Sequence, residues 1–164
     1  MKTIKTNIRK WAFLLGVMPT MLLSSCADVD DGSYVDPILL TEKIGGNWVL
    51  NDITQVDETS GTEMGLGNLL GFETFGLNLS NGGQFTVAGT APQLLPTSGT
   101  WELDNNFVKS TGDATKIILK GNEGNVTLTV TNTPGAVPNL NFQLTRYEQG
   151  QPFVSYKYNL SPVK

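Results

Sequence analysis

Apolar and polar residues alternate with a period of two through most of the chain from residue 47 onward, and this alternation most constrains the fold. A period of two places every second side chain on one face of an extended strand, which is typical of half-buried antiparallel strands. Seven alternating segments follow a first predicted strand over residues 47–56. Their apolar positions are Phe75, Leu77 and Leu79; Phe85 and Val87; Trp101 and Leu103; Ile117 and Leu119; Val126, Leu128 and Val130; Leu140, Phe142 and Leu144; and Val154, Tyr156, Tyr158 and Leu160. The sequence therefore predicts eight strands, with the residues between these positions, such as Thr145 and Ser155, on a polar face.

Short turn sequences separate these segments. Residues 80–83, 104–106 and 121–124 are rich in Gly, Asn and Asp, which tolerate the backbone conformations that tight hairpins require. Strands joined by such turns pair with their neighbours in sequence. The prediction is an all-β fold: a single antiparallel eight-stranded up-and-down barrel, whose closure removes exposed sheet edges. A two-sheet β-sandwich is the alternative.

The N-terminal residues have the layout of a secretory signal. A basic segment precedes a 13-residue apolar run over residues 11–23, which is shorter than the roughly 20 residues that a membrane-spanning helix needs. Leu23-Ser24-Ser25-Cys26 then resembles the lipobox of bacterial lipoproteins, in which the cysteine is acylated and becomes the new N-terminus. The resemblance implies that residues 1–25 are a lipoprotein signal peptide. It also implies that Cys26, the only cysteine of the chain, is the lipidation site that attaches the protein to a membrane.

An acidic segment follows this cysteine. It contains Asp28, Asp30, Asp31 and Asp36. A calcium loop of the EF-hand type is not predicted, because Gly32 falls one position too early. The segment resembles the acid-rich stretch that marks surface-exposed lipoproteins of Bacteroidota-type Gram-negative bacteria, which implies an outer-membrane, cell-surface location. We therefore assign residues 26–43 to a lipidated, flexible acidic tether and residues 44–164 to the barrel domain.

Charge and composition exclude several classes of function. Without the signal peptide the chain has seven Lys and Arg against 15 Asp and Glu, which argues against nucleic acid as a partner. The chain has no histidine, so the commonest general base and metal ligand is missing. Its only cysteine is assigned to the lipid, which excludes thiol nucleophiles and thiolate zinc sites. The sequence predicts a protein that is not an enzyme and that has no metal or cofactor.

Two copies of a G-x-W motif open predicted strands: Gly46-Asn47-Trp48 and Gly99-Thr100-Trp101. The first resembles the motif of lipocalins, whose tryptophan packs across the closed end of an eight-stranded barrel. Over roughly residues 44–160 the chain is similar to lipocalin-like domains of unknown function in Bacteroidota-type lipoproteins. A T-D-Y-like motif and a disulfide are absent. Arg146 is the candidate for the basic residue that covers the tryptophan in lipocalins.

An eight-stranded barrel can be filled by its own side chains or can hold one small ligand, and the strand pattern does not choose between these outcomes. The first hypothesis is a binding protein for a small apolar or amphipathic molecule. The candidate pocket residues are Trp48, Phe75, Phe85, Trp101, Phe142 and Tyr156. The second hypothesis is a filled barrel that docks through its loops on another cell-envelope protein or a glycan.

Two predicted loops carry an excess of apolar residues, and we expect them to flank one barrel mouth as a lid or partner surface. The first joins the first two predicted strands over residues 57–72, and the second covers residues 88–98. Apolar side chains in long loops are expected either to cover something or to meet a partner. The candidate residues are Met64, Leu66, Leu69, Leu70, Phe72, Leu94 and Leu95.

Overall fold

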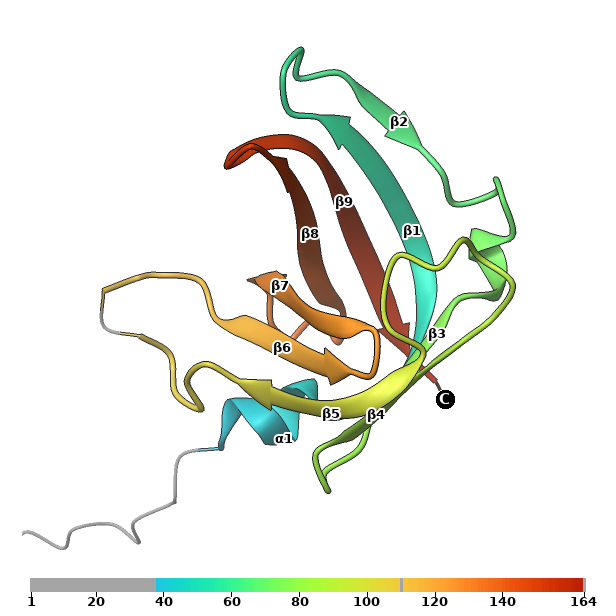
Figure 1. Ribbon diagram of the computed structural model, residues 1–164. Helices are drawn as coiled ribbons and strands as arrows, with labels where there is room; N and C mark the ends of the chain where they lie inside the picture. The colour runs from blue at the N-terminus through green and yellow to red at the C-terminus, as the bar shows by residue number, and fades with distance from the viewer. Residues whose placement is uncertain (1–37, 110, 164) are drawn as a thin grey trace, which may run out of the picture. The chain divides into compact units, whose positions relative to one another are not determined.

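A computed structural model describes residues 38–109 and 111–163 of the chain (Figure 1). Most of this part is strand. The elements, in chain order, are α1 Leu40–Ile44, β1 Gly46–Asp57, β2 Glu63–Gly65, the 3-10 helix η1 Phe72–Thr74, β3 Gly76–Leu79, β4 Gln84–Ala88, β5 Ser98–Leu103, β6 Lys116–Gly121, β7 Gly124–Asn132, β8 Leu140–Glu148 and β9 Gln151–Pro162.

Eight of the strands close into an antiparallel barrel, which confirms the predicted fold. The order is β1-β3-β4-β5-β6-β7-β8-β9, each strand pairs with its neighbour, and β9 returns to pair with β1. The closing pair runs from Trp48 opposite Pro162 to Asp57 opposite Val154. Because consecutive strands are neighbours throughout, the fold is an up-and-down barrel and not the alternative β-sandwich.

Strand β2 is an addition that the sequence pattern does not predict. It has three residues and pairs with the C-terminal end of β1, from Thr54 opposite Gly65 to Val56 opposite Glu63. The N-terminal end of β1 pairs with β3 along the same edge. A three-residue strand is too short to show an alternating pattern, so it was included in the predicted loop over residues 57–72.

The barrel interior is filled with large apolar side chains. The fully buried ones include Phe85, Leu119, Phe142, Tyr158 and Leu160, which come from strands all around the barrel. Their positions agree with the predicted inward-facing set. Burial of this many apolar side chains is the main force that stabilises the fold.

Helix α1 closes one end of the barrel, where a flexible tether was predicted up to residue 43. The side chains of Leu40 and Ile44 are 3% and 0% exposed and belong to the core. The indole N–H of Trp48 donates to the carbonyl oxygen of Ile44 at 2.9 Å. The prediction was wrong for residues 40–43, because a helix of five residues is too short for its periodicity to be recognised.

The second tryptophan motif is built in the same way. The indole N–H of Trp101 donates to the carbonyl oxygen of Ser80 at 2.9 Å, in the β3–β4 turn.

The lipocalin resemblance suggested that Arg146 covers Trp48, but it does not. Arg146 lies opposite Val154 on β9, whereas Trp48 lies opposite Pro162, so the two are at opposite ends of the barrel.

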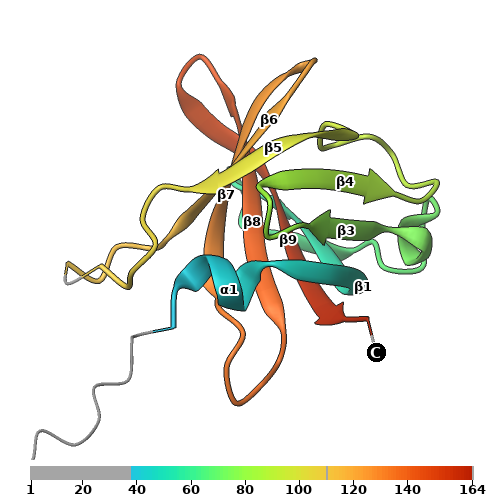
Figure 2. The same ribbon diagram turned by 90° about the horizontal axis from the view of Figure 1, so that it is seen from below.

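The connections divide into two groups at the two ends of the barrel (Figure 2). The α1 end contains α1, the β3–β4 turn, the β5–β6 connection and the β7–β8 connection. The opposite end, which we call the mouth, contains the long β1–β3 connection over residues 58–75 and the β4–β5 connection over residues 89–97. The β6–β7 and β8–β9 turns also lie there. The two apolar loops therefore flank one mouth, as the sequence predicted.

The polar face departs from the prediction at one point on β8 and β9. Ser155 was expected to face solvent, but it is 0% exposed. Its hydroxyl lies 2.8 Å from that of Thr145, and the Gln143 amide donates to the hydroxyl of Ser155 at 2.9 Å and to that of Thr145 at 3.1 Å. These hydrogen bonds satisfy the buried hydroxyl, which is why a polar residue is accommodated there.

The predicted signal peptide, the lipidation site Cys26 and the acidic segment lie outside the described residues. Among residues 38–109 and 111–163, no helix is long and apolar enough to cross a membrane.

Candidate functional site

The two connections at the mouth are locked to each other by hydrogen bonds between threonines. The backbone N–H of Thr90 donates to the hydroxyl oxygen of Thr74 at 2.7 Å, and the two hydroxyl groups are 3.0 Å apart. Gly89 lies in this contact with φ +110°, and a Cβ atom there would come within 2.4 Å of the Thr74 carbonyl oxygen. The close approach of the two backbones therefore requires glycine at position 89.

Apolar residues of both connections close most of the mouth. Leu66 and Phe72 come from the β1–β3 connection and Leu95 comes from the β4–β5 connection, and all three are at most 4% exposed. They belong to the same core cluster as the barrel interior. These three candidate lid residues are thus core residues, whose burial stabilises this end of the barrel.

The other candidate lid residues remain accessible. Leu94 is half-buried, while Met64, Leu69 and Leu70 are 51%, 49% and 68% exposed. Leu70 also has a φ of +57°, a left-handed conformation that leucine rarely adopts. The predicted loop surface therefore separates into a buried cap and an exposed leucine-rich edge, which we define as Met64, Leu69 and Leu70.

Replacing Leu70 with glycine is expected to leave the protein as stable as the wild type or to stabilise it by up to about 1 kcal/mol. The exposed side chain contributes little packing, whereas glycine adopts a positive φ without strain. Leu70→Ala is the matched control, since it removes the same side chain and keeps the strain. Urea denaturation of the two variants measures the difference, and greater stability of the alanine variant would contradict the expectation.

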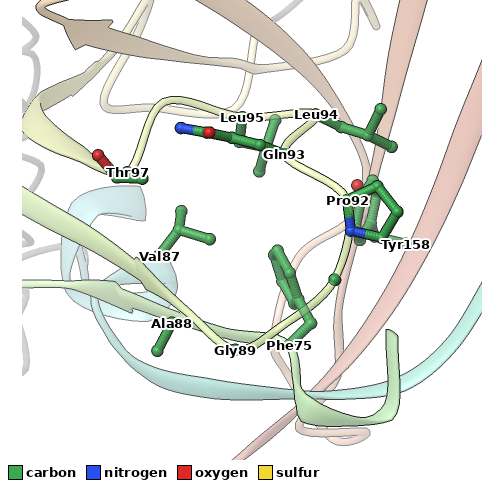
Figure 3. Close-up of a pocket in the computed structure, with 11 residues that line it drawn as sticks. Phe75, Val87, Ala88, Gly89, Pro92, Gln93, Leu94, Leu95, Thr97 and Tyr158 are labelled. Atoms are coloured by element: carbon green, nitrogen blue, oxygen red, sulfur yellow. The ribbon is translucent and has the colours of Figure 1, made fainter. Parts of the chain in front are cut away.

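A pocket lies between the β4–β5 connection and the barrel, and we call it the mouth pocket (Figure 3). Its volume is about 130 Å³. The main apolar lining residues are Phe75, Val87, Ala91, Pro92, Leu94 and Leu95. Tyr158, Gln93 and Thr97 add polar groups, and no charged side chain is among the described residues that line it. The mouth pocket is thus a small apolar site with a few polar contacts.

Tyr158 forms the wall of the mouth pocket on the side of β9. Its side chain is 2% exposed, and it lines the pocket together with Pro92 (Figure 3). Burial raises the pKa of Tyr158 above its ordinary value, with a smaller contribution from Tyr156. The hydroxyl therefore stays protonated at physiological pH and is available as a hydrogen-bond donor.

Only one of the six candidate pocket residues lines the mouth pocket, namely Phe75. Phe85 and Phe142 are buried in the core, and Tyr156 packs against it half-buried. Trp48 and Trp101 lie toward the α1 end, where each indole binds a backbone carbonyl. The structure therefore does not bring the six residues together around one site.

Tyr158, Gln93 and Thr97 were not predicted as site residues. The alternating pattern identified Tyr158 as inward-facing, but its depth in the barrel depends on the register of β9 against β1 and β8. Gln93 and Thr97 belong to a connection without periodicity. Only the Pro92–Pro96 frame around Leu94 and Leu95 marked this connection as unusual in the sequence.

Among the described residues, no group of three or more Asp, Glu, His or Cys side chains lies close enough to hold a metal ion. A larger groove of about 420 Å³ lies between α1 and β5, with Thr41, Asn81 and Trp101 in its walls. It is more open to solvent than the mouth pocket, so we take the mouth pocket as the candidate binding site.

The fold and this site together define an up-and-down β-barrel with capped ends and a small apolar pocket at one of them. The chain matches the model of one protein family, "Domain of unknown function (DUF5004)", over residues 24–161, and it belongs to this family. No curated protein and no solved structure matches the chain.

Proposed function

We propose that this protein is a non-enzymatic binding protein, anchored to the outer membrane, whose lipocalin-like barrel takes a small apolar or amphipathic ligand in the mouth pocket. The observation that carries the proposal is the mouth pocket itself. It combines apolar walls with the hydroxyl of Tyr158, as ligand pockets typically combine apolar walls with a few placed polar groups.

The volume of the mouth pocket limits the size of the bound group. Pockets for drug-sized ligands have about 300–1,000 Å³, whereas an apolar cavity of about 150 Å³ accepts benzene. At about 130 Å³ the mouth pocket suits a single ring or the end of a short chain. The filled interior of the barrel leaves no comparable room for a whole lipid.

Toluene is expected to bind wild-type protein with a Kd on the order of 1 mM, as the best affinities of very small ligands allow. At a concentration equal to its Kd it should raise the free energy of unfolding by about 0.4 kcal/mol. Val87→Phe, which fills the mouth pocket, should abolish the binding, while Thr86→Phe on the outer face of β4 should leave it unchanged. Methyl NMR spectra of Leu94 and Leu95 report binding directly, and no spectral change with toluene would refute the proposal.

The proposed anchor rests on the sequence around Cys26. The lipobox-like residues follow a basic and apolar signal, and an acidic segment follows the cysteine, which together favour an outer-membrane lipoprotein exposed on the cell surface. The family match begins at residue 24, next to this cysteine. Acyl chains on Cys26 would hold the protein on the membrane, since each buried CH₂ contributes about 0.8 kcal/mol.

Cys26→Ala tests the anchor in a Gram-negative host that processes lipoproteins. We expect the wild type to enter the detergent phase of a Triton X-114 separation and the variant to remain in the aqueous phase or as uncleaved precursor. Cys26→Ser is the size-matched control and should behave in the same way. Intact-cell proteolysis then measures surface exposure, and detergent-phase partition of either variant would contradict lipidation at Cys26.

A second candidate function is docking on another cell-envelope protein or a glycan through the exposed leucine-rich edge. The strained, exposed Leu70 favours it, because strain at an accessible residue is more typical of functional sites than of scaffolding. Leu69→Ser combined with Leu70→Ser should then abolish partner capture in cross-linked envelopes with little change in melting temperature. A large loss of stability would show that these leucines belong to the core.

A further inference from the structure

The ring of Tyr158 is held in one orientation by two phenylalanines. Its ring centroid lies 4.8 Å from that of Phe142, with the rings stacked at 26°, and 5.3 Å from that of Phe75, with the rings tilted at 44°. Phe142 is fully buried and Phe75 is 4% exposed, so neither neighbour can easily move aside. The hydroxyl of Tyr158 therefore has a fixed place at the mouth pocket.

No hydrogen bond joins this hydroxyl to another of the described residues, and it is not among their fully buried polar atoms that lack a partner, so water still reaches it. A ligand that fills the pocket would displace this water, and leaving the hydroxyl without a partner would then cost about 1–3 kcal/mol. Most buried tyrosines avoid this cost by finding an acceptor. Because Tyr158 lines the mouth pocket, its hydroxyl thus favours a ligand that offers it an acceptor atom.

The remaining walls argue against a charged ligand. None of the described residues that line the mouth pocket is charged, and the Gln93 amide donates toward the Glu123 carboxylate at 3.4 Å, which places an acid at the rim. A carboxylate in the pocket would therefore lose its hydration without gaining a cationic partner. An ammonium group would find no carboxylate among the described residues that line the pocket.

We propose that the mouth pocket selects a neutral ligand that joins a ring-sized apolar body to one hydrogen-bond acceptor, and that this acceptor binds the hydroxyl of Tyr158. The inference rests on the proposed binding function and narrows its ligand class. Free fatty acids and other ligands that must place an ionised group inside the pocket are excluded. Neutral ketones, ethers and esters of compact shape are the expected class.

Three probes of nearly equal size test this ligand class on the folded protein: α-methylstyrene, acetophenone and benzoate. They carry the same ring and differ in a C=CH₂, a C=O and a carboxylate group. In the wild type we expect acetophenone to bind and benzoate to bind at least tenfold more weakly. Tyr158→Phe should weaken acetophenone binding about two- to tenfold, the range for one neutral hydrogen bond, and should change α-methylstyrene binding less than twofold.

A second readout needs no variant. The ¹³C resonance of the phenolic carbon of Tyr158 should shift when acetophenone binds and should stay in place with α-methylstyrene. Equal effects of Tyr158→Phe on both neutral probes, or benzoate binding as tight as that of acetophenone, would overturn this inference and leave the pocket intact. Such benzoate binding would point to a cation at the mouth, such as Arg146. Failure of all three probes to bind would remove the site and, with it, the proposed function.

Discussion

Gly99→Ala is expected to destabilise the barrel by about 3–5 kcal/mol. Gly99 has a φ of +154°, and a Cβ atom at this position would come within 2.1 Å of the carbonyl oxygen of Lys120 on the paired strand β6. A strained backbone conformation costs about 1–3 kcal/mol, and forcing an extra carbon into a packed site costs a similar amount. Because the blocking atom belongs to the backbone, it cannot move aside without disturbing the β5–β6 pairing.

Gly46→Ala is the matched control, because Gly46 opens the other G-x-W motif and also has a positive φ, of +147°. A Cβ atom there would meet only the indole nitrogen of Trp48, at 3.8 Å. We therefore expect a loss of about 1–2 kcal/mol from strain alone. Urea denaturation gives both values, and equal losses would show that the close approach at Gly99 has no energetic weight.

Ile44→Ala is expected to cost about 2–5 kcal/mol, although the sequence placed the beginning of the folded domain at this residue. The Ile44 side chain is fully buried in the core, and its removal leaves a cavity under α1. The loosened helix would also weaken the hydrogen bond from the Trp48 indole to the Ile44 carbonyl oxygen. Trp48 fluorescence during urea unfolding should report both the lower stability and a wetter indole.

Lys43→Ala provides the control within the same helix, because Lys43 is exposed and makes no ion pair with any described residue. Its substitution should change stability by less than about 0.5 kcal/mol. If Ile44→Ala were equally mild, α1 would be a loosely attached turn and not the cap of the barrel.

The barrel could be predicted from the sequence because alternation is a local property. Each strand from Phe75 to Leu160 shows its buried face through a period of two, and the short turns leave little choice of strand order. The parts that were missed are the ones too short to have a period. Helix α1 has five residues and β2 has three, and both are held by contacts with residues elsewhere in the barrel.

The site was less predictable than the fold. It depends on how far along the barrel each inward-facing side chain lies, whereas the alternating pattern shows only which side chains face inward. Phe85, Phe142 and Tyr158 all face inward, but only the register of β9 places Tyr158 beneath the β4–β5 connection. The loop residues likewise could be recognised as unusual without showing their roles. Leu95 is buried in the core because it contacts residues of other strands, whereas Leu70 is exposed and has a positive φ angle.

The placement of α1 and the mouth pocket at opposite ends of the barrel has a consequence for the proposed lipid anchor. If Cys26 carries the lipid, as proposed, the anchor joins the barrel through α1, at the end away from the mouth pocket. Eleven residues separate Cys26 from the described part of the chain, and a stretch of this length spans at most about 35–40 Å, which limits how far the barrel could lie from the proposed lipid. Under the proposed function, the anchor would therefore not compete with the ligand for the same end of the barrel. A protein arranged in this way would bind and release its ligand without leaving the membrane.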